Sequence, residues 1–534
     1  MPTGAVDAGK GGPSRAVPGA GWALALLIGI NLFNYIDRQI LSATLPKIKR
    51  DADIFQAGDD WINTKLGALT TAFMVAYMCL SPLFGRFGDR MSRWVLVGIA
   101  VILWSLATGG TGLAVGYVTL FLTRCLVGVG EAAYGPVAPA MLSDMYPTDH
   151  RGRVMSWFYM AIPVGSALGF VIGSQVAETD MGWRGAFHLA VIPGIVLGAL
   201  CFFMKESPKH VDTLTPVPEG TGGASPHAPS YWAVLRELRL NTSFVLCCAG
   251  MTASTFVLGG VATVMQLYVF EREARFKFDE HVIDQLRTES RFKRSDGTLL
   301  VPEEVLGKLP EATSPDILSL PELETRLKGN RSKNKTGPLT EAEFATYGGD
   351  ILEASAAKGY ITNGTIGLYI GAIVVVSGLV ATLAGGLLGD FLRNRGVKGA
   401  YFLISGWGMV IAFPFFLAMM YVPFPYAWGC LFVSVFFLFF NTGPANTILA
   451  NVTRSPIRAT AFAINIFIIH ALGDAISPLI IGFVADLSSL HTAFVAVSAL
   501  IPISGSLWIW GANHLDEDTA AAEAGVTGPR APAK

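Results

Sequence analysis

GRFGDRMSR, residues 85–93, recurs in this chain as GLLGDFLR, residues 386–393. Both copies follow an apolar run and share the pattern Gly-x-x-Gly-Asp with a later arginine. A second pair of loops also repeats, because Pro147 and Arg151 correspond to Pro456 and Arg458. Repeats at matching loops predict a chain of two similar halves, an arrangement that places a central site between the halves in membrane proteins.

The composition predicts that lipid is the main solvent of the chain. Of its 534 residues, 52% are hydrophobic and only 15% are charged, too few to cover a soluble protein of this length. The net charge of −1 and the lack of a long basic stripe argue against nucleic acid as a partner. The six cysteines have no CxxC or metal-finger spacing, so we expect no disulfide framework, metal or cofactor.

Twelve apolar runs are long enough to cross a bilayer, which requires about 20 residues of helix. The predicted fold is therefore an all-α polytopic membrane protein with twelve transmembrane helices in two six-helix, pseudo-symmetric halves. The expected spans are residues 22–46, 65–85, 94–114, 117–145, 154–177, 186–204, 243–270, 363–389, 400–421, 425–450, 458–484 and 491–512.

Lysine and arginine gather on alternate short loops, and this pattern predicts that those loops face the cytoplasm. Both termini then lie in the cytoplasm, and the chain is expected in a bacterial inner membrane or a plasma membrane, functional as a monomer. The expected parts are a disordered tail (1–21), a first half (22–204), a linker (205–242), a second half (243–512) and a disordered tail (513–534).

Two segments do not fit a plain pair of halves. The linker is rich in Pro, Gly and Ser and ends in YWAVLRELRL, either a helix along the inner membrane surface or part of a plain tether. Residues 271–360 hold 17 acidic and 14 basic side chains, which predicts a soluble extracytoplasmic insertion between helices 7 and 8. We expect it to be partly helical, with a capping box at Thr340 to Glu343. A cap over the outer mouth and an inert insertion both remain open.

Six ionisable residues lie well inside the expected spans: Asp37 and Arg38, Arg124 and Glu131, and His470 and Asp474. A charge within the bilayer is costly unless it is paired or faces water, so each is a candidate functional residue. The alternative is that they form structural ion pairs between helices.

Helical rise places Asp37 and Arg124 at a similar depth and predicts that they pair across a cavity, with Glu131 about 10 Å deeper on the same face as Arg124. Asp37 and Glu131 are the candidate proton carriers, because a carboxyl that exchanges arginine partners can load and release a proton. Arg38 and Arg124 suit an anionic headgroup, which arginine binds by charge-assisted, bidentate hydrogen bonds.

His470 and Asp474 are four residues apart and share a helix face. The pair is able to hold one proton or to orient the imidazole. It also supplies two potential metal ligands, but no third ligand has suitable spacing, so no metal site is expected.

The charged loop motifs lie where helix ends meet the inner surface, and they predict residues that hold the inner gate closed. These candidate gating residues are Asp89, Arg90, Arg93, Asp144, Asp390 and Arg393. Gly165, Gly169 and Gly173 form a small-xxx-small stripe that permits close helix contact.

The chain resembles the major facilitator superfamily in GRFGDRMSR and in RCLVGVGE (residues 124–131). Within it, NYIDR (34–38), GEAAYGPVAPAMLSDMYP (130–147) and HALGDAISP (470–478) resemble the Spinster family of lipid transporters. The resemblance implies proton-coupled export of lysophospholipids or sphingosine-1-phosphate-like molecules. It implies coupling and headgroup roles for Glu131 and the Asp37–Arg38 pair. Asn34 and Tyr134 lie in these motifs, and we expect them, with His470 and Asp474, to form supporting polar contacts. The insertion departs from the family pattern.

Three functions remain open at this point. The first is a proton-coupled lipid exporter working by alternating access. The second is a major facilitator carrier of small organic acids or drugs. The third is a membrane-embedded enzyme or receptor that uses His470 and Asp474, but the chain lacks a recognisable nucleophile motif, and we do not expect an enzyme.

Overall fold

The computed structural model describes residues 17–56, 59–146, 148–205, 231–273, 362–454 and 457–524, with further residues scattered between 275 and 355. In this part of the chain, twelve helices are long and apolar enough to cross a membrane, which confirms the expected class. The helices of the first half are α1 (Ala20–Ile48), α2 (Ile62–Arg90), α3 (Arg93–Gly112), α4 (Tyr117–Met145), α5 (Thr148–Val176) and α6 (Gly182–Cys201).

The second half repeats this arrangement with more breaks. Its helices are α8 (Thr242–Glu273), α13 (Asn363–Asn394), α14 (Ala400–Tyr421), α15 (Tyr426–Phe440), α16 (Thr442–Val452), α17 (Arg458–Ile469), α18 (Ser477–Leu487), α19 (Leu490–Ser498) and α20 (Leu500–Gly511). The tenth, eleventh and twelfth spans are therefore each built from more than one segment. The break in the eleventh span is a π-helix, His470–Asp474, and Pro478 starts the next segment, where its missing N–H costs no hydrogen bond.

The predicted glycine stripe is confirmed as a close helix contact. Gly165, Gly169 and Gly173 of α5 face α1, and a Cβ atom on Gly169 would lie only 2.5 Å from the carbonyl oxygen of Ile36. Only hydrogen at these positions permits the backbones to approach so closely, as in other membrane helix pairs.

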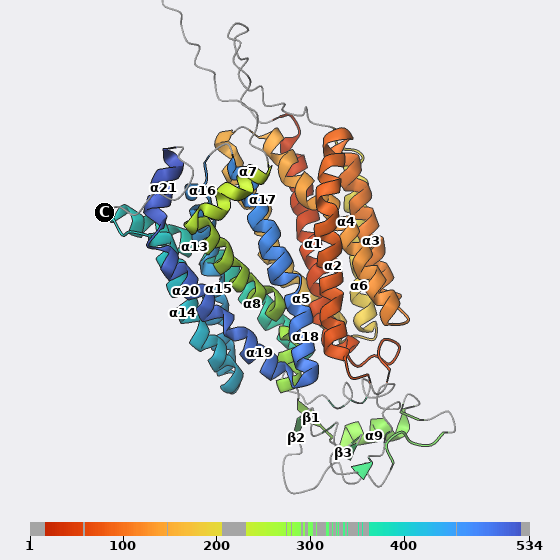
Figure 1. Ribbon diagram of the computed structural model, residues 1–534. Coiled ribbons are helices and arrows are strands. Elements are labelled where there is room, and N and C mark those ends of the chain that lie inside the picture. The colour runs from red at the N-terminus through yellow and green to blue at the C-terminus, as the bar shows by residue number, and fades with distance from the viewer. Residues whose placement is uncertain are drawn as a thin grey trace, which may run out of the picture.

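The bundle has two ends that differ in what they carry (Figure 1). The insertion end carries β1 (Arg275–Lys277), α9 (Glu280–Thr288), β2 (Ile317–Ser319), β3 (Gly329–Asn330) and β4 (Lys335–Thr336). β1 pairs with β2 and β3 with β4, both antiparallel. The insertion is thus partly helical, as expected, with short strands, and its predicted capping box at 340–343 lies outside the described residues. Buried residues such as Phe292, Leu300 and Leu306 form a separate core for it.

The opposite end, the linker end, carries α7 (Tyr231–Leu240) and α21 (Leu515–Glu523). The amphipathic stub is therefore a helix. The prediction of a disordered tail over residues 513–534 is wrong for α21. Three acidic residues in its first turn stabilise the helix N-terminus. Leu515 is buried, and Asp518 accepts a hydrogen bond of 2.8 Å from the backbone nitrogen of Ser243, which anchors α21 to the start of α8.

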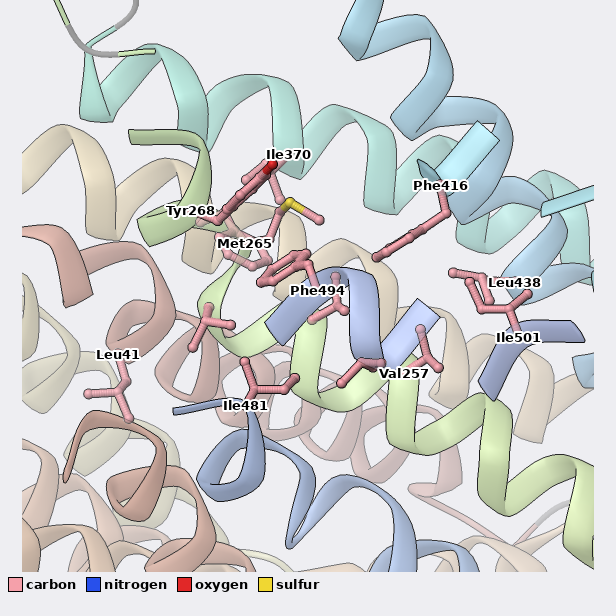
Figure 2. Close-up of a cluster of buried hydrophobic side chains, with 14 of the residues drawn as sticks. Leu41, Val257, Met265, Tyr268, Ile370, Phe416, Leu438, Ile481, Phe494 and Ile501 are labelled. Carbon is pink, nitrogen blue, oxygen red and sulfur yellow. The ribbon is translucent and has the colours of Figure 1, made fainter. Parts of the chain in front are cut away.

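One hydrophobic core joins the two halves. Buried residues of α1, such as Leu41, belong to the same cluster as Met265, Ile370 and Ile481 of the second half. Figure 2 shows these side chains converging from several helices. The halves are thus held together by apolar packing, and the polar contacts between them can select which end is closed.

Candidate functional site

A cavity of about 370 Å³ lies between the two halves. The first half contributes two cations to its wall, Arg38 and Arg124. The second half contributes mostly apolar side chains, among them Met265, Phe416 and Leu438, which Figure 2 shows. The cavity therefore has a cationic side, and an opposite side that is mostly apolar but also carries His470 and Asp474.

Arg38 and Glu131 form the central ion pair. The Arg38 Nε and Nη2 atoms each lie 2.7 Å from Glu131 Oε2, which ties α1 to α4. The Glu131 side chain is only 1% exposed, against 20% for Arg38, so the guanidinium reaches the cavity while the carboxylate lies behind it. Glu131 Oε1 is buried without a hydrogen-bond partner among the described residues.

Three aromatic rings surround the Arg38 guanidinium. Its central carbon lies 5.1 Å, 4.9 Å and 5.2 Å from the ring centres of Tyr35, Phe73 and Tyr77. Cation–π contacts of this kind stabilise a guanidinium that has lost its water. These three rings were not predicted from the sequence, although Tyr35 lies within the NYIDR motif.

Asp37 and Arg124 lie near enough for their charges to attract, but no direct ion pair or hydrogen bond joins them among the described residues. Asp37 Oδ2 accepts a hydrogen bond from the Thr108 hydroxyl of α3, and Oδ1 has no partner in the described part of the chain. Arg124 is 1% exposed, and its Nε and Nη1 atoms are buried with no hydrogen-bond partner there either. Depth along a helix predicted the level of both residues but not their direction around the axis. Arg124 is therefore a buried cation with donors available at the cavity wall.

Asn34 and Tyr134 take different places. Asn34 is buried, and its Nδ2 atom has no hydrogen-bond partner among the described residues. The Tyr134 hydroxyl donates a hydrogen bond of 2.7 Å to the carbonyl oxygen of Leu27, and its ring packs edge-on against Trp104. The structure thus places Tyr134 within the packing of the first half, away from the cavity wall.

His470 and Asp474 lie together on the opposite side of the cavity. The His470 Nδ1 atom is 3.0 Å from both carboxylate oxygens of Asp474, and both residues line the cavity. Both residues belong to the π-helix, a distortion that often accompanies functional sites. The structure brings Arg38, Arg124, His470 and Asp474 to one cavity.

The candidate gating residues lie at the linker end. Arg93 forms an ion pair with Asp144. In the second half, the Tyr401 hydroxyl donates a hydrogen bond of 2.7 Å to Asp390, and the Arg393 guanidinium lies 5.8 Å from the Tyr401 ring centre. The side chains of Asp89 and Arg90 lie outside the described residues. The corresponding loops of the halves thus each hold a local polar contact within their own half.

Polar contacts between the halves gather at the insertion end, and sequence reasoning missed them. The Asp486 carboxylate, at the end of α18, accepts hydrogen bonds from the backbone nitrogens of Asn63 (2.9 Å) and Thr64 (2.7 Å) and from both side chains. These nitrogens belong to the first turn of α2, where Trp61 supplies no side-chain cap. Asp486 therefore caps a helix of the other half.

A second cap is related to the first by the internal repeat. Glu178, just after α5, accepts a hydrogen bond of 2.8 Å from the backbone nitrogen of Gly364 at the start of α13. A Cβ atom on Gly364 would lie 2.5 Å from Glu178 Oε2, so glycine permits this approach. The fifth span (α5) is therefore followed by the acid that caps the eighth span (α13), and the eleventh span (α18) carries the acid that caps the second (α2). Lys49 adds an ion pair of 2.7 Å with Glu271 of α8.

Comparison with known proteins identifies the fold and its relatives. The family model described as Major Facilitator Superfamily matches residues 27–279. A bacterial homologue of the human lysosomal transporter Spinster, in an inward-facing and unoccupied conformation, superposes with a TM-score of 0.66 at 16% identity, covering 97% of this chain and all of that one. This chain has the major facilitator fold and resembles the spinster proteins.

Curated relatives carry the spinster name. Human protein spinster homolog 1 is 39% identical over 247 residues, and this match spans 44% of the human protein, less than half of its length. Zebrafish (Danio rerio) protein spinster homolog 3 is 28% identical over 520 residues, 94% of this chain and 86% of that protein. The inward-open xylose transporter of E. coli shares the fold, with a TM-score of 0.56. These solved transporters thus share the fold of this chain.

Proposed function

We propose that the protein is a secondary active transporter that exports a single-chain anionic or zwitterionic lipid, such as a lysophospholipid or a sphingosine-1-phosphate-like molecule. The main support for this proposal is that the cavity wall is cationic on the side of the first half and mostly apolar on the side of the second half. Arg38 and Arg124 offer charge-assisted donors to a phosphate on one side, and the apolar wall of the second half accepts an acyl chain on the other. An amphiphile matches both sides at once.

The buried carboxylates supply the proton coupling in this proposal. A phosphate at Arg38 competes with Glu131 for the guanidinium, because both are anions that need the same donors. Once Glu131 has lost its arginine partner it takes up a proton, since an unpaired carboxylate in this buried site would be costly in free energy. Asp37, with one unpartnered oxygen beside α3, is the second candidate carrier.

The loop charges orient the molecule, with the linker end and both termini in the cytoplasm. The insertion-end caps then close the outer side of the bundle, and the cavity receives its substrate from the cytoplasmic side. Release follows when these contacts open and the linker end closes, which is alternating access.

Binding measurements separate a lipid from a small organic acid, the second candidate, which the sugar-transporter fold of the neighbours also permits. Purified protein in nanodiscs is titrated with lysophosphatidylglycerol, glycerol-3-phosphate and lactate. We expect saturable binding of the lysolipid alone, and loss of this binding in both Arg124→Gln and Arg124→Lys. Lysine retains the charge but lacks the planar fork that binds two phosphate oxygens.

Binding of the short acids with equal affinity would contradict the lipid assignment. Leu438→Ala provides a matched control for the apolar wall, since it should weaken the lysolipid and leave any binding of glycerol-3-phosphate unchanged.

A further inference from the structure

A second cavity lies on the lipid-facing side of the second half, at the linker end. This groove has a volume of about 640 Å³ and is bounded by α7, α8, the eleventh span and α20. Its lining is apolar, with Phe244, Ala253, Ile468 and Leu472, and Arg239 is its one charged lining residue within the described part of the chain. Leu472 is 57% exposed, so the groove opens toward the membrane.

The groove is separated from the central cavity by a tight helix contact. Thr255 and Gly259 of α8 face the central cavity, and Thr252 and Phe256 of the same helix face the groove. A Cβ atom on Gly259 would lie 2.3 Å from the Asp474 Cβ atom, and one on Gly473 would lie 3.2 Å from Thr255. These glycines seal the wall, so an occupant of the groove does not share the transport cavity.

The end of the groove next to α7 is positively charged. α7 carries Arg236 and Arg239, both exposed, and one acidic residue, Glu237. Glu237 accepts a hydrogen bond of 2.7 Å from the Arg454 Nε atom, which also raises the pKa of Arg454. Arg454 thus neutralises Glu237, and the charges of Arg236 and Arg239 are left to attract an anion. Trp232 on the same helix is 77% exposed, a residue type that favours the membrane interface.

We propose that this groove binds an anionic diacyl phospholipid of the leaflet at the linker end, with one acyl chain in the groove and its phosphate at Arg239. The groove is apolar along its length and has a cation, Arg239, at the end where the amphipathic helix α7 lies. This combination fits a lipid with an anionic headgroup, because basic pockets between helices bind such headgroups. The lipid fixes α7 against α8 and is not transported. The site does not depend on the substrate of the central cavity.

Native mass spectrometry of the full chain, titrated with phosphatidylglycerol or phosphatidylcholine, tests the site. We expect one tightly bound phosphatidylglycerol and weaker binding of phosphatidylcholine. Arg239→Gln should weaken phosphatidylglycerol about fivefold, the effect of one basic residue near a membrane surface. Arg236→Gln is the matched control, because it makes the same charge change three residues away without lining the groove.

Ala253→Phe fills the groove without changing charge and should remove both the tight binding of phosphatidylglycerol and the weaker binding of phosphatidylcholine. A variant that keeps the thermal stability of the wild type shows that folding is not the cause. Equal losses in Arg236→Gln and Arg239→Gln would show diffuse electrostatic attraction and overturn the site. Equal affinity for the two lipids would overturn the proposal that the site selects an anionic headgroup. Unchanged binding in Ala253→Phe would overturn the proposal that an acyl chain lies in the groove.

Discussion

Arg38 is the ion-pair partner of Glu131. The Glu131 Oε2 atom is shared by the Nε and Nη2 atoms of Arg38, and its other oxygen has no hydrogen-bond partner in the described structure. The sequence predicted that these charges lie in the bundle, because their cost in lipid marks them out. It did not predict the partners, since the azimuth of α1 relative to α4 follows from tertiary packing. Asp37 therefore meets Thr108 where Arg124 was expected.

Arg38→Gln should destabilise the protein by about 3 kcal/mol, the lower end of the cost of breaking a buried pair, because Arg38 is 20% exposed. The double variant Arg38→Gln/Glu131→Gln should recover most of this loss, since no unpaired charge remains. Thermal unfolding in detergent, followed by tryptophan fluorescence, measures both. Equal destabilisation of the single and double variants would show that the charge pair is not the source of the effect.

The helices themselves were largely predictable, because a bilayer requires long apolar runs. The span over residues 400–421 coincides with α14, and the span at 117–145 coincides with α4. The interruptions in the tenth to twelfth spans were not predictable from hydropathy, which stays high through a π-helix. The two insertion-end caps were also missed, because Asp486 and Glu178 are ordinary loop-end acids until the halves come together.

Asp486→Asn should open the insertion end. The carboxylate accepts hydrogen bonds at both oxygens, and an amide nitrogen cannot accept. A charged group at a helix N-terminus contributes about 1 kcal/mol, so the open population should rise about fivefold. Spin labels at Val115 and Tyr426, exposed residues at the insertion end of each half, report the distance between the halves in a background without the exposed Cys79.

Asp59→Asn is the control for that measurement, because Asp59 pairs with Lys65 of its own half and should leave the distance distribution unchanged. An identical distribution in wild type and Asp486→Asn would contradict a role for the cap in closing this end.

At the scale of the whole molecule, the insertion is a body of its own attached to the bundle. Its buried residues, including Phe278, Leu286 and Leu323, form a cluster distinct from the membrane core, with Phe270 of α8 packed against both. Figure 1 shows it beyond the ends of the helices. Replacing residues 275–361 with a short Gly/Ser linker should therefore leave a monodisperse, folded bundle. Size-exclusion chromatography and thermal unfolding check this, and aggregation of the variant would show that the insertion is required for the fold.

In the function that we propose, the bundle couples proton movement to lipid movement through Glu131. A proton moving down a potential of 100 mV supplies about 2.3 kcal/mol, enough to drive uphill transport that exchange alone does not sustain. Glu131→Gln keeps the shape and an acceptor for Arg38 but removes the exchangeable charge.

The most direct measurement is the flux of labelled lysophospholipid in proteoliposomes, with and without an imposed pH gradient, for wild type and Glu131→Gln side by side. We expect flux that rises with the gradient in the wild type, and gradient-independent exchange alone in the variant. Folded wild-type protein that transports no lysophospholipid, or a variant that responds to the gradient as the wild type does, would contradict proton-coupled lipid transport through Glu131.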